Sequence, residues 1–215
     1  YKNYKNIILY NNLLFDQDTN FFPNLKILGA PRYCREWNEI QSNFFPKINN
    51  LFENKKDNIL LILEKDHKQR YKDKYIDVID PSNFNTLINF LLKNDNFNLI
   101  IKSHPSSKNN FQDLVKNKNL LFIDSDDKYK TFQLTKYVDV VLGFKSGAIC
   151  DAILLNKYFL LLDFCHTFKL VASKFINKSN IALSFDDFKY KLENFKKHKE
   201  DNQKFIDEFL GDKNN

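Results

Sequence analysis

Five continuous apolar runs between residues 58 and 164 limit most strongly the folds open to this chain. They stand in the segments NILLILEK, FNLIIKSHP, NLLFIDS, VDVVLG and KYFLLLDF. An unbroken apolar run is typical of a strand buried on both faces, because a strand with one wet face alternates apolar and polar residues. Segments with helical spacing stand between them: DPSNFNTLINFLLKND, YKTFQLTKY and SGAICDAILLN. We therefore predict an α/β fold, a doubly wound parallel sheet of the Rossmann-like type.

The chain is predicted to have three parts. Residues 1–50 hold two short apolar runs, NIILYNN and NLKILG, and are expected to be a partial N-terminal domain that ends in an inter-domain linker. Residues 58–184 are expected to form the Rossmann-like domain, and residues 185–215 to hold one long amphipathic helix, roughly from Phe185 to Leu210. The chain starts at Tyr1 and contains no Met, so we expect it to be a fragment that lacks a preceding segment.

Charge and cysteine content narrow the classes of partner and compartment. The formal net charge of +6 favours anionic partners, but the lysines are dispersed and no nucleic-acid recognition motif is present. We therefore expect no nucleic-acid partner. Cys34, Cys150 and Cys165 form no metal-binding or paired pattern, which favours a reducing cytoplasm over a disulfide framework. No apolar stretch is long enough to span a bilayer.

Two of the four glycines stand close together in the segment LGFKSGAICDAILLNK. Gly143 is expected to let the chain turn sharply after a strand, and Gly147 to let the backbone approach a ligand. Ser146 is suited to cap the helix that follows. A helix N-terminus binds anions, and Lys145 adds a full positive charge. The loop is therefore a candidate phosphate site, although a plain capping role remains open.

A second anion-suited loop follows the strand in LIIKSHPSS. Lys102, Ser103, His104 and Ser106 surround the point at which Pro105 ends the strand. A histidine there can donate to a phosphate oxygen and, when protonated, neutralise a leaving group. Carboxyl ends of parallel strands share one edge of the sheet, so we expect the two loops to face the same phosphorylated ligand.

The segments IIKSHP and YVDVVLGFKSGAICDAILLNKYFLLLDF resemble the donor-binding half of GT-B glycosyltransferases that build bacterial surface and capsule polysaccharides. Sialyltransferases, polysialyltransferases, Kdo transferases and CDP-glycerol glycerophosphotransferases share an HP pair after one strand and a serine-rich loop that opens a helix. The segment LGAPRYCREW resembles the linker region of surface carbohydrate biosynthesis proteins. The resemblance covers residues 58–164 well and implies a GT-B C-terminal domain. It also implies that the terminal helix packs back toward the N-terminal domain.

The resemblance implies a role for each matching residue. His104 would contact the donor phosphate and assist its departure, Ser146 and the Gly147 backbone would bind the same phosphate, and Asp151 would hold a ribose hydroxyl or a basic partner. Lys65 would face the donor. The set of donor-binding residues is Lys65, Lys102, Ser103, His104, Ser106, Gly143, Lys145, Ser146, Gly147 and Asp151.

The implied activity is a metal-independent transfer of a sugar from a nucleotide-activated donor, CMP-linked, to a glycan or lipid-linked acceptor. No cofactor or metal is expected. A cytoplasmic location, with peripheral association at the inner membrane face, follows from the same resemblance. The sequence departs from the family in having SG where a serine pair is expected, and no acidic motif for a general base is recognisable.

Other interpretations compete with this one. A UDP-GlcNAc 2-epimerase-like enzyme shares the fold, although SGAICDA matches its Ser-Gly-Gly loop less well, and a non-catalytic nucleotide-binding module is a further alternative. Asp163, Cys165 and His166 are adjacent in sequence, whereas a catalytic triad converges from separate loops. Asp124, Asp126 and Asp127 are better explained as a polar turn after a strand than as a metal site.

Overall fold

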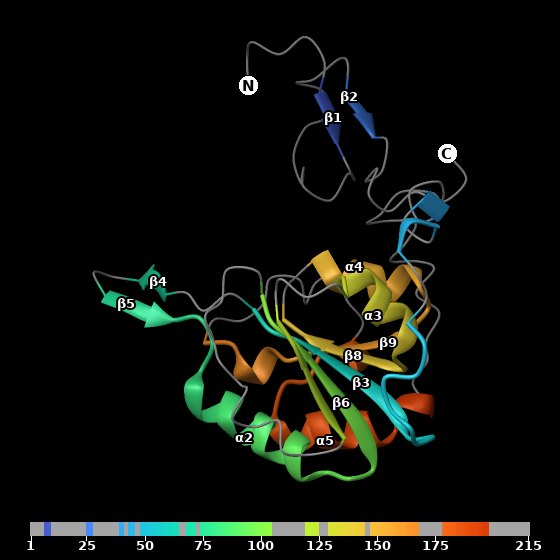
Figure 1. The fold of residues 1–215 in the computed structure, drawn as a ribbon. Helices are drawn as coiled ribbons and strands as arrows, with labels where there is room; N and C mark the ends of the chain where they lie inside the picture. The colour runs from blue at the N-terminus through green and yellow to red at the C-terminus, as the bar shows by residue number, and fades with distance from the viewer. Residues whose placement is uncertain are drawn as a thin grey trace. The chain divides into compact units, whose positions relative to one another are not determined.

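The computed structural model describes the chain as two compact units, residues 1–47 with 200–215 and residues 48–199 (Figure 1). In the first unit, β1 (Ile7–Leu9) pairs in parallel with β2 (Leu25–Ile27), and these strands lie in the two short apolar runs. The three-part division of the chain stays a prediction. The residues described are 7–9, 25–27, 39–40, 43–45, 48–64, 68–71, 74–104, 119–124, 129–144, 147–167 and 178–197.

The second unit is built on a parallel sheet of five strands, in the spatial order β7-β6-β3-β8-β9. The strands are β3 (Asp57–Ile62), β6 (Phe97–Lys102), β7 (Leu120–Ile123), β8 (Val140–Gly143) and β9 (Tyr158–Leu161). Each lies in one of the five apolar runs. The predicted Rossmann-like α/β fold is therefore confirmed.

The central strand β3 pairs with β6 on one side and with β8 on the other. Ile59, Leu60 and Leu61 are at most 1% exposed. Ile59, Leu61 and Leu63 belong to one hydrophobic core cluster, and the side chain of Leu60 lies on the opposite face because side chains alternate along a strand. Burial on both faces explains why this run has no polar residue at alternate positions.

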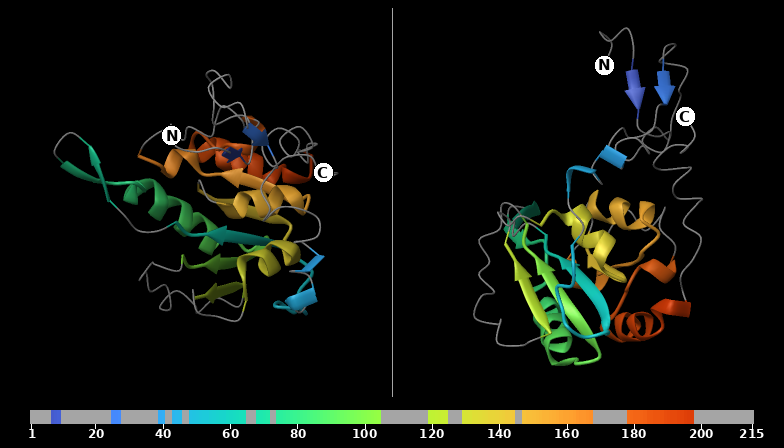
Figure 2. Two further views of the ribbon diagram at one scale, coloured as in Figure 1. Left: turned by 90° about the horizontal axis from the view of Figure 1, so that it is seen from above. Right: turned by 45° about the vertical axis from the view of Figure 1, so that its right-hand side comes forward.

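Helices cover both faces of the sheet. They are α2 (Pro81–Lys93), α3 (Thr131–Tyr137), α4 (Gly147–Leu154) and α5 (Phe185–Glu193). Figures 1 and 2 show α2 and α5 against one face and α3 and α4 against the other. The ring of Phe90 in α2 meets Phe185 and Phe188 of α5 edge-on, with ring centroids 5.6 and 5.9 Å away. The sheet is thus doubly wound.

Helix α2 begins where the sequence predicts. The side chain of Asp80 accepts a hydrogen bond of 2.8 Å from the backbone N–H of Asn83, and Pro81 occupies the first turn. Proline costs nothing there because its missing N–H would have no partner inside the helix. A hairpin that the sequence analysis did not predict precedes this helix: β4 (Lys68–Tyr71) pairs antiparallel with β5 (Lys74–Asp77). Neither strand contains a continuous apolar run, since their sequences are KQRY and KYID.

An amide network ties the segment before β3 to the amino edge of the sheet. Asn98 is fully buried, and its Nδ2 donates to Oδ1 of Asn54 at 2.8 Å and to Oδ1 of Asn58 at 2.9 Å. Asn54 Nδ2 donates back to Asn98 Oδ1 at 3.0 Å. This buried asparagine is therefore paired through both its amide nitrogen and its oxygen, as a polar group in a core requires.

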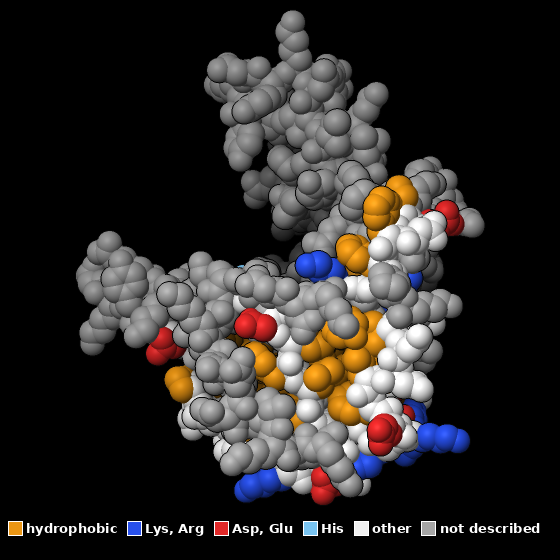
Figure 3. Space-filling view, viewed as in Figure 1, with side chains coloured by type: hydrophobic (Ala, Val, Ile, Leu, Met, Phe, Trp, Pro, Cys, Tyr) orange, Lys and Arg blue, Asp and Glu red, His pale blue; other side chains and the backbone are white. Residues whose placement is uncertain are grey.

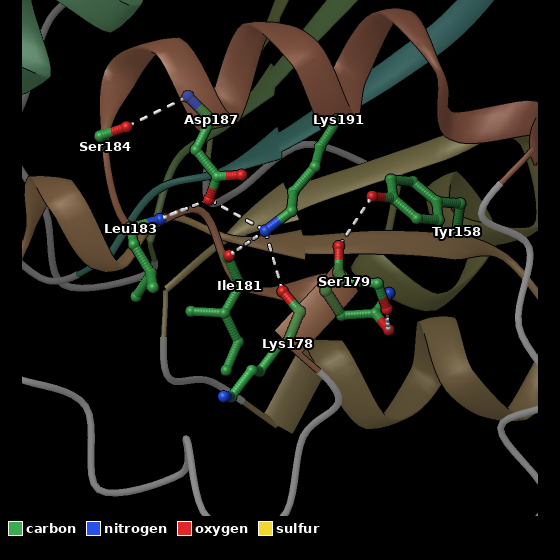
Figure 4. Close-up of polar contacts among 9 residues, drawn as sticks. Tyr158, Lys178, Ser179, Ile181, Leu183, Ser184, Asp187 and Lys191 are labelled. Carbon is green, nitrogen blue, oxygen red and sulfur yellow. Dashed lines mark hydrogen bonds and ion pairs between the residues drawn. The ribbon is translucent and has the colours of Figure 1, made fainter.

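Lys191 anchors helix α5 to the segment that leads into it (Figure 4). Its Nζ donates to the carbonyl oxygens of Lys178 and Ile181, at 2.9 and 2.8 Å, and to Oδ2 of Asp187 at 2.9 Å. All three donors of the ammonium group are used. The hydroxyl of Ser184 caps the same helix by accepting from the N–H of Asp187 at 3.1 Å. The anchor holds α5 on the sheet at the point where β9 has ended.

The terminal helix is shorter than predicted. A continuous helix from residue 185 to about 210 was expected, but α5 ends at Glu193 and a 3₁₀ turn, Phe195–Lys197, follows. Asn194 is the C-cap residue: its backbone N–H and its side-chain Nδ2 both donate to the carbonyl oxygen of Tyr190, at 3.1 and 2.8 Å. Residues 198–215 lie outside the described part of the chain. Within that part, no helix is long and apolar enough to cross a membrane.

Replacing Lys191 with Met tests the anchor. The variant keeps the apolar stem but removes three hydrogen bonds that a charged donor makes to two carbonyl oxygens and a carboxylate, so we expect unfolding to become easier by about 1–3 kcal/mol. Urea unfolding followed by circular dichroism measures the change. The control is Lys189→Met, which removes the exposed ion pair with Asp186 and should cost less than about 1 kcal/mol. Equal losses in the two variants would contradict the anchoring role.

Candidate functional site

The order of the strands creates a topological switch point between β3 and β8. The chain runs from β3 outward to β6 and β7, then returns to the other side of β3 and continues through β8 to β9. Connections that leave β3 and β8 therefore diverge to opposite faces of the sheet, as Figure 1 shows. Open α/β sheets bind ligands outside the carboxyl ends of their strands at such a point. This edge is the candidate site.

The KSHP loop leaves β6, directly beside β3. Lys102 is 5% exposed, and its Nζ donates to the backbone carbonyl of Asp124 at the end of β7. Ser103 is also buried, and its N–H donates to the carbonyl of Ile123 at 3.0 Å. His104 is the first residue of this loop with partial exposure. Lys102 and Ser103 thus join two strands, and of the three residues His104 is the one best exposed to meet a ligand.

The second loop leaves β8 on the other side of β3. Gly143 is the last residue of the strand, and a Cβ built there would lie 3.5 Å from Ile149 Cδ1 and 3.8 Å from Ile62 Cβ. These are ordinary packing distances, so a residue with a Cβ has room at this position. The expectation that the turn after β8 needs glycine at Gly143 is therefore not supported by a lack of space. Helix α4 begins at Gly147, as predicted, and Asp151 lies one turn further on, 4% exposed.

Several predicted donor-binding residues lie outside the described part of the chain. They are Lys65, Ser106, Lys145 and Ser146. Their roles stay predictions, as do those of Asp126 and Asp127 after β7. Within the described ranges, no group of three or more His, Cys, Asp or Glu residues is placed to hold a metal ion.

The adjacent residues Asp163, Cys165 and His166 form a packed corner rather than a nucleophilic centre. Asp163–Cys165 is a 3₁₀ turn after β9, and the carbonyl of Cys165 accepts from the N–H of Asp80 at 2.8 Å, which seats the turn on the start of α2. Cys165 is fully buried. Burial, with a smaller contribution from the Asp80 carboxylate, raises the pKa of its thiol to about 12. A thiol of this kind is inert as a nucleophile at neutral pH.

Glu64 is the residue at this edge that the sequence analysis did not consider. It follows the end of β3, and its Oε2 lies 3.7 Å from Nε2 of His166. The side chains of Glu64 and His166 are 18% and 10% exposed. Its position in the sequence could have identified it as a candidate site residue, because Glu64 is the first charged residue after the apolar run of the central strand. Its partner is far away in sequence and becomes a neighbour only through the fold.

Charged side chains are mixed over the face drawn in Figure 3. The described Lys and Arg side chains there are interspersed with Asp and Glu instead of forming one basic patch. A single-sign surface is what binding to a nucleic-acid backbone requires. The absence of a nucleic-acid partner nevertheless stays a prediction.

Comparisons with known proteins find the same fold in sugar-nucleotide enzymes. UDP-GlcNAc 2-epimerase from Methanocaldococcus jannaschii, in complex with UDP-GlcNAc and UDP, superposes with a TM-score of 0.56 at 18% identity over 98% of this chain and 56% of that one. The Staphylococcus aureus MnaA–UDP structure gives 0.53 at 12% identity, over 88% and 51%. A variant of the wall teichoic acid polymerase TagF gives 0.51 at 15% identity, over 96% and 54%.

These likenesses show a shared Rossmann-like fold of the GT-B type. The chain spans about half the length of each of these structures. No family model matches the sequence, and no curated protein matches it at a significant level.

Alkylation of Cys165 tests the buried corner. With the pKa of its thiol at about 12, only about one molecule in ten thousand carries the thiolate near pH 8, and burial blocks access as well. We expect iodoacetamide to leave Cys165 unmodified in the folded protein and to modify it in concentrated guanidinium chloride, as read by peptide mass spectrometry. Cys165→Ser confirms the peptide assignment. Rapid labelling of Cys165 in the folded protein would show that the corner is open and reactive.

Proposed function

We propose that the chain is the donor-binding part of a glycosyltransferase that uses a nucleotide-activated sugar. The observation that carries this proposal is the topology: the KSHP loop after β6 and the GFKSG loop after β8 leave the two strands that flank β3, at the switch point. Ligands of open α/β sheets bind there. Two loops suited to anions at one switch point support a ligand with a phosphate group.

In the proposed reaction, an acceptor hydroxyl attacks the anomeric carbon of the donor sugar. The bond between that carbon and the phosphate oxygen breaks, and the departing nucleotide takes the electron pair. His104 donates a hydrogen bond to the phosphate as its charge grows, and the N–H groups at the start of α4, with Ser146 and Lys145, hold the same group. The acceptor proton passes to a base outside the described residues. These positive groups take the role that a metal ion plays in other transferases, so no cofactor is proposed.

The finer assignment follows from the resemblance in the sequence. We propose a CMP-linked donor, a glycan or lipid-linked acceptor, and a place in surface polysaccharide synthesis. A cytoplasmic protein that associates with the inner face of the membrane suits this role, because the acceptor grows there. Two of the three superposed structures contain UDP-GlcNAc or UDP, which keeps a uridine donor and a UDP-GlcNAc 2-epimerase-like activity as the alternative to test.

A thermal-shift titration of the full chain with CMP, CDP, UMP and UDP tests the proposal. We expect a cytidine nucleotide to stabilise the protein and the His104→Ala variant to bind it roughly 10- to 100-fold more weakly, as expected for the loss of a hydrogen bond to a charged group. Ser146→Ala should weaken binding in the same direction.

The control is Asn96→Ala, an exposed residue at the opposite end of β6. It should leave the affinity unchanged. A preference for UDP would favour the epimerase-like alternative, and binding without any sugar transfer would favour a non-catalytic module. No stabilisation by any of the four nucleotides would contradict the proposed function.

A further inference from the structure

Glu64 stands at the centre of the candidate site. It follows β3, the strand that pairs with both β6 and β8, and these two strands lead into the two anion-suited loops. The backbone of Leu63, one residue earlier, donates to the carbonyl of Lys102 at 3.0 Å, so β3 and β6 stay joined up to the KSHP loop. The carboxylate therefore lies where ligands of such sheets bind.

One oxygen of this carboxylate is buried without a hydrogen-bond partner among the residues that the structure describes. Glu64 Oε2 has essentially no exposed surface, so the 18% exposure of the side chain comes from its other atoms. Burying a charged oxygen without a hydrogen bond costs free energy, and such groups in native structures are rare and call for an explanation.

His166 is the nearest cationic candidate, and it compensates the carboxylate only partly. The distance of 3.7 Å from Nε2 to Oε2 is too long for a hydrogen bond, and the attraction is that of an ion pair only when the imidazole is protonated. The imidazole is held from its backbone: the N–H of His166 donates to the carbonyl of Asp163 at 3.0 Å. The pair is thus preformed, and the carboxylate still has capacity to accept a hydrogen bond.

We propose that Glu64 accepts, through Oε1, the carboxylate oxygen that is not buried, a hydrogen bond from a hydroxyl group of the bound nucleotide-sugar and thereby selects the ligand. The inference rests on the proposed function. A carboxylate repels the phosphates that the flanking loops are suited to hold, so its contact is with a neutral, hydrogen-donating part of the ligand. The ribose and the transferred sugar both carry such hydroxyls. His166 is a positioning residue: its Nε2, 3.7 Å from the buried Oε2, attracts that side of the carboxylate and leaves Oε1 to the ligand.

Two variants separate this role from a structural one. Glu64→Leu keeps much of the side-chain volume and removes charge and acceptor, and Glu64→Gln keeps a neutral acceptor. Because each removes a partly buried charge that has no hydrogen bond and only a distant ion-pair partner, we expect the melting temperature without ligand to stay the same or rise. We expect Glu64→Leu to bind the preferred nucleotide or nucleotide-sugar about 10-fold or more weakly, and Glu64→Gln to fall between it and the wild type. The control is Glu53→Gln, an exposed carboxylate before the amino end of the same strand.

The ligands used in the titration identify the hydroxyl. Calorimetry compares CMP and UMP with their 2′-deoxy and 3′-deoxy forms, and with CMP-N-acetylneuraminate and UDP-GlcNAc. If Glu64→Leu lowers the affinity for the ribonucleotide but not for one deoxy form, the contact is with the ribose hydroxyl that this form lacks. If the variant lowers the affinity for the nucleotide-sugar alone, the contact is with the transferred sugar.

Three results would overturn the proposal. If Glu64→Leu binds every ligand with the affinity of the wild type, the proposed hydroxyl contact is ruled out, and the proposed function is unaffected. Equal weakening toward all ligands, or a large fall in melting temperature without ligand, shows a role in the fold instead of hydroxyl recognition. Binding of none of these ligands by the wild type overturns the proposed function, and the assignment of Glu64 with it.

Discussion

Burial of β3 on both faces is the constraint on which the rest of the larger unit depends. A strand whose side chains are excluded from water on both sides needs a hydrogen-bonded neighbour at each edge and a helical layer over each face. Strands β6 and β8 supply the edges, and the pairs α2–α5 and α3–α4 supply the layers. Because the chain builds one side of β3 before the other, the carboxyl end of this strand becomes the switch point.

Buried polar groups at the two ends of the sheet differ in whether they have hydrogen-bond partners. At the amino edge, Asn54, Asn58 and Asn98 exchange amide hydrogen bonds, so both the Nδ2 and the Oδ1 of the buried Asn98 have partners. At the carboxyl edge, Glu64 keeps an oxygen that no described residue satisfies. Proteins commonly give up stability where a ligand binds, because the groups that receive it must lack partners in its absence. The contrast supports a structural role for the first edge and a binding role for the second.

The fold limits the broad class of function but does not identify a substrate. Rossmann-like sheets carry many activities, so function has to be argued from the residues at the switch point. Among the described residues, the proposed function rests on His104, Glu64 and the start of α4, which follow β6, β3 and β8. The corner around Cys165 shows the opposite case: a reactive residue type that the fold has buried and made inert. Sequence adjacency of Asp163, Cys165 and His166 reflects a tight turn, not shared chemistry.

By itself the sequence determined the strands, the start of α2 and α4, and hence the edge that holds the site, because these features depend on local patterns: unbroken apolar runs, a proline in the first helical turn, a helix opened at Gly147. It did not determine the hairpin β4–β5, whose strands KQRY and KYID contain no continuous apolar run. The end of α5 was also not determined, because no glycine or proline directly follows Glu193 to mark it. Nor did it show that Gly143 has ordinary space for a Cβ. Only the tertiary structure brought Glu64 to His166, residues from the ends of two strands that β8 separates, because their proximity follows from the order of the strands and not from their spacing in the chain.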